Sequence, residues 1–457
     1  MAVTRDVGVG PWTRPPGRPP SDAAGEAARA VRRGVPFLLT MPAYGGTLAA
    51  ARCLGRHGIP VTMAGHGALV PARWSRHVAR WVRCPPVGET DRFLDWLFAF
   101  GEREPGHVLY PTSDDLAWLI ADRASDLRRS YRLYAPSVAT VLRLLDKRAL
   151  HESCARVGVD TVPTAFPAGA EPARAAAREL GFPVLLKPRT QVLSATRAKG
   201  KFVEQPGELA DAYAGFLAYN RYGPGLPKLL PGADLPMLQV FRPQANDGIY
   251  SIAGFVGPGP DQVAARASRK ILQRPRRLGV GICYEEAPVD AGALDGLVRL
   301  CRAVGYVGVF EAEYVPEGGR LELIDFNPRF YGQMGFEVAR DLPLGYLSWL
   351  GACGEEQALA RTLSEARRWS EGRGYVYCDR LVLGLTLLAQ RLSGRMTATE
   401  ASRWRQWQKD HRRHRLLIEA MDWPGDRLPF LVSAAFQIQF ALRHPRAFMR
   451  NVARGVN

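Results

Sequence analysis

The chain has 457 residues, of which 47% are hydrophobic and 23% charged. This length indicates roughly two or three domains, and the composition is that of a soluble globular protein. The formal net charge of +17 is uneven, because residues 361–457 hold eighteen Lys and Arg against eight Asp and Glu. The seven cysteines form no CxxC pair, which excludes a zinc site or disulfide framework of ordinary spacing and favours a cytoplasmic protein.

The first part of the chain indicates a tail followed by a parallel sheet. Residues 1–35 are rich in Pro, Gly, Ala and Arg without an apolar signal region, so we expect a disordered tail. Residues 36–137 alternate strand-like and helix-like segments, which predicts parallel strands with helical crossovers. The expected strands are 35–40, 59–65 and 107–113, and the expected helices are 45–58 and 91–104. The glycines of "AYGG" after the first strand are a weak phosphate-binding signal on their own.

Residues 138–352 follow a different pattern. A helix is predicted from 138, ended by a glycine and followed by an extended X-Pro segment. The stretch "GFPVLLKP" predicts a strand that contains Lys187, and a lysine inside an apolar strand breaks a local rule, as functional sites often do. A polar loop at 191–201 follows. Two consecutive antiparallel strands are expected at 236–243 and 248–257, and a basic strand at 265–275.

The stretch "LELIDFNPRFYGQ", from Leu321 to Gln333, has the richest chemistry. In a strand, residues two apart share a face, so Asp325, Asn327 and Arg329 are expected to point the same way. The preceding "VFEAEYV" and a Glu-Gly-Gly turn predict a hairpin that brings Glu313 close to Asp325. Two carboxylates and an amide oxygen are ligands that suit Mg²⁺, and a guanidinium suits phosphate. A strand running into a polar turn is the plainer interpretation.

The order of these motifs resembles the ATP-grasp superfamily, in particular its carboxylate–amine ligase and carbamoyl-phosphate-synthase-like branch. The resemblance rests on "LLDKRAL", "GFPVLLKP", "LQVF" and "FEAEYV…LELIDFNPR", and it covers about residues 36–350. It implies an α/β fold of the α+β ATP-grasp type. The domains expected are a parallel-sheet pre-ATP-grasp (Rossmann-like) domain at 36–137, a two-lobed ATP-grasp domain at 138–352, and a basic helical C-terminal extension at 353–457.

The resemblance also implies the roles of individual residues. The expected cofactors are ATP and Mg²⁺ or Mn²⁺, with the metal on Glu313, Asp325 and Asn327. Arg329 would steady the transferred phosphoryl group, together with Lys187 and Arg269. The nucleotide-binding residues expected are Lys147, Lys187, Ser194, Thr196, Lys199, Gln239, Val240, Phe241, Asp247 and Lys270.

The sequence departs from the family pattern in three places. Asp325 stands where Glu is usual, and Gln239 in the hinge strand stands where the family often has Glu, with Asp247 as another candidate for the ribose. The phosphate loop "TQVLSATRAKG" is not the usual glycine-rich run. Glu311 is a rival to Glu313 as the hairpin acid, although its fourteen-residue offset from Asp325 fits the hairpin less well.

The function implied is that of an ATP-dependent ligase, which activates a small-molecule carboxylate as an acyl phosphate and joins it to an amine. A carbamoyl-phosphate-type phosphorylating enzyme and a non-catalytic ATP-binding protein are the alternatives. Dimers are frequent in families of this kind, so a homodimer is one expected assembly. The basic extension and its apolar stretch 428–442 indicate either peripheral contact with an anionic inner membrane surface or packing on the core. No recognition motif for nucleic acid is present, so such a partner is not expected.

Overall fold

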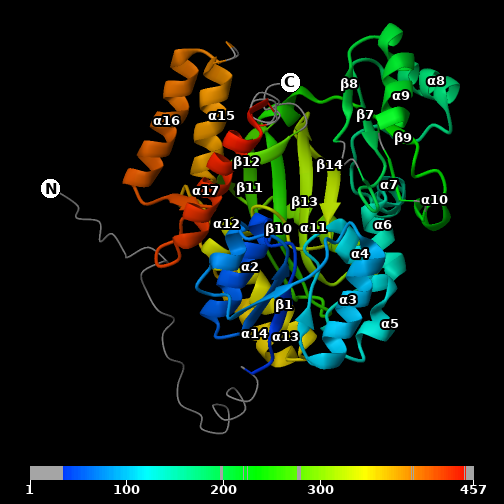
Figure 1. The fold of residues 1–457 in the computed structure, drawn as a ribbon. Helices are drawn as coiled ribbons and strands as arrows, with labels where there is room; N and C mark the ends of the chain where they lie inside the picture. The colour runs from blue at the N-terminus through cyan, green and yellow to red at the C-terminus, as the bar shows by residue number, and fades with distance from the viewer. Residues whose placement is uncertain are drawn as a thin grey trace.

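The computed structural model describes residues 34–195, 199–219, 221–223, 225–274, 279–392, 394, 396–446 and 448. The tail expected at 1–35 therefore lies outside the described residues, apart from its last two. The described chain is built on three sheets (Figure 1). Within these residues, no helix has the length and apolar character needed to cross a membrane.

The first sheet is parallel and has the strand order β3-β2-β1-β4-β5. Its strands are β1 (Phe37–Leu39), β2 (Val61–Gly65), β3 (Arg80–Arg83), β4 (Val108–Leu109) and β5 (Arg132–Leu133). The connections contain α2 (Gly45–Arg56), η1 (Pro71–Trp74), α3 (Thr90–Arg103), α4 (Asp114–Asp122) and α5 (Ala124–Leu127). The strand order reverses between β1 and β4, and in open sheets of this kind ligands bind beyond the carboxyl ends of the strands at that point.

The helical segment that follows is broken into α6 (Val138–Leu145) and α7 (Lys147–Val157). Asp146 lies between them as the N-cap of α7, where its side chain accepts a hydrogen bond from the Arg148 N–H. Asp146 also accepts two hydrogen bonds from the Arg189 guanidinium, at 2.5 and 2.6 Å. This pair fixes the start of α7, and therefore Lys147, against the end of β7 (Val184–Pro188).

The second sheet is small and has the order β6-β9-β7-β8. Besides β7, its strands are β6 (Thr164–Ala165), β8 (Lys201–Val203) and β9 (Pro236–Val240), and the helices of this lobe are α8 (Ala170–Leu180), η2 (Pro206–Glu208), α9 (Leu209–Tyr219) and α10 (Leu226–Leu229). Its own core packs the inner faces of β7 and β9 against α8 and α9. Figure 1 shows this lobe at the upper right, away from the parallel sheet below.

The third sheet has seven strands in the order β14-β13-β10-β11-β12-β15-β16. The strands are β10 (Ile249–Val256), β11 (Val263–Arg274), β12 (Val280–Ala287), β13 (Gly308–Glu317), β14 (Arg320–Asn327), β15 (Val376–Cys378) and β16 (Leu417–Glu419), with η3 (Pro243–Asn246) and α11 (Ala291–Val304) between them. The predicted hairpin is confirmed as β13–β14. The strands predicted at 236–243 and 248–257 both form, but they do not pair with each other, because β9 belongs to the small sheet and β10 to the large one.

The C-terminal part contributes strands as well as helices. Its helices are α12 (Met334–Ala339), α13 (Leu344–Ala352), α14 (Glu356–Arg367), α15 (Arg380–Leu392), α16 (Ala398–Arg413) and α17 (Leu428–Arg443). β15 pairs with β12 and β16 pairs with β15, so this part of the chain extends the large sheet at its edge. The sequence pattern predicted helices in residues 353–457 but not α12 or α13, and the two short strands became visible only in the fold.

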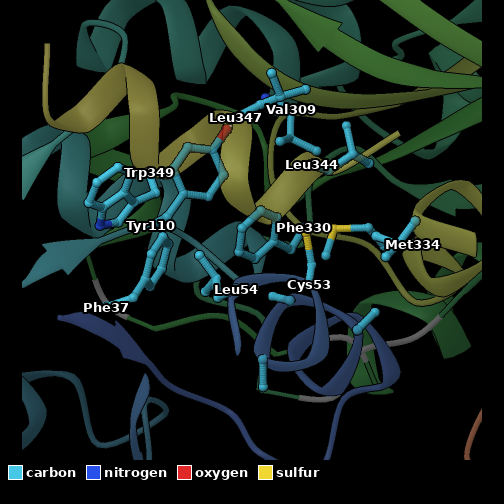
Figure 2. Close-up of a cluster of buried hydrophobic side chains, with 14 of the residues drawn as sticks. Phe37, Cys53, Leu54, Tyr110, Val309, Phe330, Met334, Leu344, Leu347 and Trp349 are labelled. Atoms are coloured by element: carbon cyan, nitrogen blue, oxygen red, sulfur yellow. Dashed lines mark hydrogen bonds between the residues drawn. The ribbon is translucent and has the colours of Figure 1, made fainter. Parts of the chain in front are cut away.

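The largest core joins the parallel sheet to the large sheet through α2, α12 and α13 (Figure 2). In it the Phe330 ring lies 4.7 Å from the Tyr110 ring, and the Tyr110 hydroxyl accepts a hydrogen bond of 2.7 Å from the Val309 N–H. The glycines of "AYGG" begin α2 and lie directly against the backbone of residues 331–332. A Cβ atom on Gly45 would be 2.8 Å from the Gly332 carbonyl oxygen, and one on Gly46 would be closer still to Tyr331. These glycines therefore allow the start of α2, in the parallel-sheet part, to pack closely against the segment that follows β14 of the large sheet.

Candidate active site

The β13–β14 hairpin places its polar side chains on one face of the large sheet. Glu313 lies directly across from Asp325, and Glu311 directly across from Asn327. The opposite face of β14 is apolar, where Phe326 packs against Phe310 with the rings 6.2 Å apart. The expected sharing of one face by Asp325 and Asn327 agrees with this register.

A bulge in the hairpin changes what the strand presents. The register shifts between Glu313 and Tyr314, because Tyr314 is paired with Leu323 and Ile324 has no partner in the ladder. A bulge places two successive residues on the same side of a strand, and Ile324 and Asp325 both line the same cavity. Simple alternation could not have predicted that an apolar and an acidic side chain would be neighbours there.

That cavity lies between the small and large sheets and has two different ends. The apolar end is lined by Val162, Leu185, Val240, Ile249, Val315 and Ile324. The polar end is lined by Asp114, Lys147, Lys187, Lys199, Lys270, Glu313, Asp325 and Asn327. An elongated ligand with one flat apolar group and several anionic groups matches this division.

Each acidic or amide side chain at the polar end accepts a hydrogen bond from a lysine or arginine. The Lys147 Nζ donates to Asp325 at 2.5 Å, and the Lys270 Nζ donates to Glu313 at 2.7 Å. Arg329 donates to the Asn327 side-chain oxygen at 2.8 Å. Burial alone would raise the pKa of Asp325, but the positive charges of Lys147 and Lys187 hold it below its ordinary value. The carboxylate is therefore ionised at neutral pH.

Lys187 has a pKa far below that of an ordinary lysine. Burial, followed by repulsion from Lys147, lowers the pKa of Lys187 to about 8. Its Nζ donates to the Gln239 side-chain oxygen at 3.1 Å, and Gln239 in turn donates to the Thr164 hydroxyl at 3.0 Å. Gln239 is thus engaged through its side chain in orienting Lys187, a role that its place in the hinge strand did not suggest.

At the end of β9, the predicted hinge strand, the backbones of Val240 and Phe241 each lie opposite a proline. The N–H of Val240 donates to the Pro163 carbonyl at 3.0 Å, and the N–H of Phe241 donates to the Pro183 carbonyl at 3.2 Å. Proline has no N–H to return, so the carbonyls of Val240 and Phe241 receive no hydrogen bond from these two partners. Val240 lines the apolar end of the cavity. An exocyclic amino group of a purine is a donor that such carbonyls accept.

The buried acid Glu311 joins the site, although sequence reasoning ranked it below Glu313. Its carboxylate accepts a hydrogen bond from Asn327 at 3.0 Å and another from Gln333. Burial and the nearby Glu313 charge raise the pKa of Glu311 to about 8. Glu311 therefore holds Asn327 and Gln333 in place from beneath the cavity. The sequence signal for Glu311 was its position two residues before Glu313 in the same predicted strand.

Asp114 comes from the parallel-sheet part of the chain, and sequence reasoning missed it as a site residue. It begins α4, after the carboxyl end of β4, and accepts a hydrogen bond of 2.5 Å from the Arg329 Nε. Its neighbour Asp115 accepts one of 2.8 Å from the Leu193 N–H in the loop after β7. The available signal was its position beyond a strand end in a parallel sheet.

Several expected site residues lie elsewhere. Arg269 is exposed, and it lies on the opposite face of β11 from Lys270 because neighbouring residues of a strand alternate. The two side chains therefore cannot both face one ligand. Lys270 lines the cavity and Arg269 does not. Asp247 is exposed and outside the cavity lining, and Ser194 is buried in the loop after β7. The Phe241 side chain packs edge to face on Phe202, with the rings 4.8 Å apart, so its expected contact with the nucleotide would come from its backbone carbonyl. Thr196 lies outside the described residues.

The side-chain oxygens of the hairpin are suitable ligands for a divalent cation. Glu313 and Asp325 offer two carboxylates from facing positions, and Asn327 offers an amide oxygen beside them, which are hard ligands for Mg²⁺ or Mn²⁺. Within the described ranges, no group of three or more His, Cys, Asp or Glu side chains is arranged so that it could hold a metal ion. Two acids and an amide leave coordination positions for water and phosphate oxygens, as Mg²⁺ sites usually do.

Comparison with known proteins finds likeness in structure only. Neither a family model nor a curated protein matches the sequence. The biotin carboxylase domain of Hydrogenobacter thermophilus 2-oxoglutarate carboxylase, solved with MgADP, ADP and bicarbonate, has a TM-score of 0.56 at 18% identity, over 70% of this chain and 69% of that chain. The Staphylococcus aureus N5-carboxyaminoimidazole synthetase complexed with ADP has a TM-score of 0.53 at 12% identity, over 70% and 78%. The Bacillus licheniformis L-amino acid ligase has a TM-score of 0.51 at 14% identity, over 70% and 74%.

These three proteins are ATP-grasp enzymes, and each likeness covers 70% of this chain. The sequence motifs predicted this architecture, and the structural comparison confirms it. The protein has the ATP-grasp fold.

Proposed function

We propose that the protein is an ATP-dependent ligase that activates a substrate carboxylate as an acyl phosphate and joins it to an amine. The observation that carries this proposal is the cavity between the small and large sheets, which is apolar at one end and lined by four lysines and two hairpin acids at the other. A nucleoside triphosphate has the matching distribution of a flat base and a chain of anionic groups.

The base would lie at the apolar end, with its amino group toward the carbonyls of Val240 and Phe241. The phosphates would then reach the ammonium groups of Lys147, Lys187, Lys199 and Lys270. Two of these lysines now contact the hairpin acids, at 2.5 Å for Lys147 and 2.7 Å for Lys270. An ammonium can donate up to three hydrogen bonds, so both lysines would be able to donate to phosphate oxygens in addition to the acids that they contact now.

Glu313, Asp325 and Asn327 would hold Mg²⁺ or Mn²⁺. When bound, the cation would neutralise charge on the phosphate oxygens and orient them for transfer. The facing positions of the two acids favour this assignment, as does the low pKa of Asp325, since metal ligands must be deprotonated.

The carboxylate acceptor would lie beside Arg329. Arg329 is held between Asp114 and Asn327, so its guanidinium is oriented before any ligand arrives. Its partner Asp114 follows the carboxyl end of β4, one of the two strands between which the strand order of the parallel sheet reverses. In the first step a carboxylate oxygen would take the γ-phosphoryl group from ATP, and ADP would leave. In the second the amine nitrogen forms the C–N bond, phosphate leaves and the nitrogen loses a proton.

The first acceptors to test are bicarbonate and amino acids, because structural neighbours are a biotin carboxylase domain solved with bicarbonate and an L-amino acid ligase. The experiment measures release of ADP and phosphate with each carboxylate, alone and with amines, and identifies the product by mass spectrometry. Lys187→Met and Asp325→Asn serve as inactive references. A ligase releases ADP only when both substrates are present or far faster with both.

The outcomes separate the alternatives. ADP release with bicarbonate and ammonia that yields carbamoyl phosphate would assign the phosphorylating reaction instead. Stabilisation by Mg·ATP without ADP release for any acceptor would assign nucleotide binding without ligation. No stabilisation by Mg·ATP at all would contradict the nucleotide site itself.

We further propose a cytoplasmic location and a homodimeric assembly. The described cysteines are all free, and all but Cys353 are buried, which suits a reducing compartment. One structural neighbour was solved as a dimer. The molecular mass in solution, measured by sedimentation over a range of protein concentrations, tests the assembly.

A further inference from the structure

Helix α17 exposes several large apolar side chains. Pro429 is the single buried residue among its sixteen. Leu428, Leu431, Ile438 and Leu442 are between 54 and 78% exposed. Residues at these spacings share one face of a helix, so they form a continuous row, which we name the α17 stripe.

Positive charge brackets the α17 stripe. Residues 428–442 contain no Asp, Glu, Lys or Arg, whereas Arg427 directly precedes them and Arg443 directly follows. Both arginines are exposed, with Arg427 also in a loose ion pair of 3.7 Å with Asp422, and Arg446 is exposed one turn after Arg443. The helix thus has an uncharged apolar body with cationic ends, and the segment 361–457 to which it belongs carries more than twice as many basic as acidic residues.

The surface beside α17 has the same character. α17 packs against η1, and η1 carries Trp74, whose side chain is 41% exposed. Exposed Arg76 follows two residues later. Tryptophan with neighbouring arginine is the combination that favours the boundary between lipid headgroups and acyl chains.

We infer that the α17 stripe docks on an anionic lipid surface, with the helix lying in the plane of the headgroups. At about 1.5 Å per residue, sixteen residues are too short to span the hydrocarbon layer, but an in-plane helix needs only one apolar face. The bracketing arginines complement anionic headgroups. A second copy of this chain fits less well, because both ends of the helix are cationic and any parallel or antiparallel pairing of two copies brings like charges together.

The experiment uses the full chain and co-sedimentation with two kinds of vesicle, phosphatidylcholine alone and phosphatidylcholine mixed with phosphatidylglycerol. We expect binding to the mixed vesicles that weakens as salt rises, and little binding to phosphatidylcholine. Ile438→Asp should lower the affinity by about tenfold or more, because it removes apolar burial and adds a repelled charge. Leu217→Asp is the matched control, since Leu217 is 42% exposed on α9 in the small lobe.

Two further measurements keep the result unambiguous. Equal stabilisation of wild type and Ile438→Asp by Mg·ATP shows that the variant is folded, because α17 lies outside the cavity lining. Absence of binding to the mixed vesicles, equal binding to both kinds of vesicle, or an equal loss in Leu217→Asp would overturn the proposal. So would concentration-dependent self-association that Ile438→Asp abolishes, because this would assign the stripe to a second copy of the chain.

Discussion

Asp114 and Arg329 form an ion pair that joins two sheets of the molecule across 215 positions of sequence, with 2.5 Å between the Arg329 Nε and the Asp114 carboxylate. Both side chains are less than one-fifth exposed. Arg329 also donates to Asn327 on the hairpin. The pair therefore sets the direction of the guanidinium at the end of the cavity where the acceptor carboxylate is proposed to bind.

Asp114→Asn should reduce ligase turnover by about tenfold or more while changing the Kd for Mg·ATP by less than about threefold. The asparagine removes the negative partner of Arg329 but leaves the hinge and the lysines untouched. Steady-state kinetics and calorimetric titration with a non-hydrolysable ATP analogue check the two values. Asp122→Asn, at the exposed end of the same helix, should change neither. An equal loss of nucleotide affinity and turnover in Asp114→Asn would contradict this division of roles.

Asp325→Asn should strongly weaken the dependence of nucleotide binding on Mg²⁺. Wild type at about 100 times the Kd should gain about 2.7 kcal/mol of stability from Mg·ATP, and most of this gain should disappear in the variant because a ligand carboxylate is lost. Urea unfolding with and without Mg·ATP measures it. The matched control is Asp160→Asn, an exposed acid paired with Arg320 outside the cavity. An undiminished gain in Asp325→Asn would place the metal elsewhere.

The stability of the nucleotide-free protein should rise with pH between about 8 and 10.5 through Lys187. Its pKa in the fold is about 8 against an ordinary 10.5, so in this window the unfolded chain binds more protons than the folded chain. The free energy of unfolding therefore increases with pH, by about 1–3 kcal/mol over the window.

The comparison is between wild type and Lys187→Met, each unfolded by urea at pH 7 and pH 9.5. The rise should be smaller in Lys187→Met, whereas Lys201→Met, on the exposed end of β8, should behave as wild type does. A rise of the same size in Lys187→Met would show that other groups cause it.

Gly46→Ala should destabilise the protein by about 1–3 kcal/mol, because the new Cβ would collide with the Tyr331 backbone. Urea unfolding measures the loss. Gly215→Ala in α9 is the control, since a Cβ there meets nothing within 4 Å and alanine favours a helix. A loss of the same size in both variants would show that the close approach of α2 to residues 331–332 has no special cost.

Local pattern was enough to predict the chemistry of the hairpin. Asp325 and Asn327 share a face because strand residues alternate, and Glu313 faces Asp325 because a short turn joins two adjacent strands. The strand lysine Lys187 stood out as a candidate because a charge in an apolar strand needs a reason, and Lys187 does line the cavity. The parallel sheet followed from alternating strand and helix segments. All these features depend on residues close together in the sequence.

The tertiary structure decided what depends on distant segments meeting. Asp114 contacts Arg329 only because the parallel sheet packs against the large sheet through the core around Phe330. Strand pairing decided that Lys270, and not Arg269, faces the cavity, and one bulge placed Ile324 beside Asp325. The strands β15 and β16 were too short to stand out from the helices around them; β15 is stabilised by pairing with β12, and β16 by pairing with β15. Sequence alone carries the types of group available at the site, whereas long-range packing determines which of them meet.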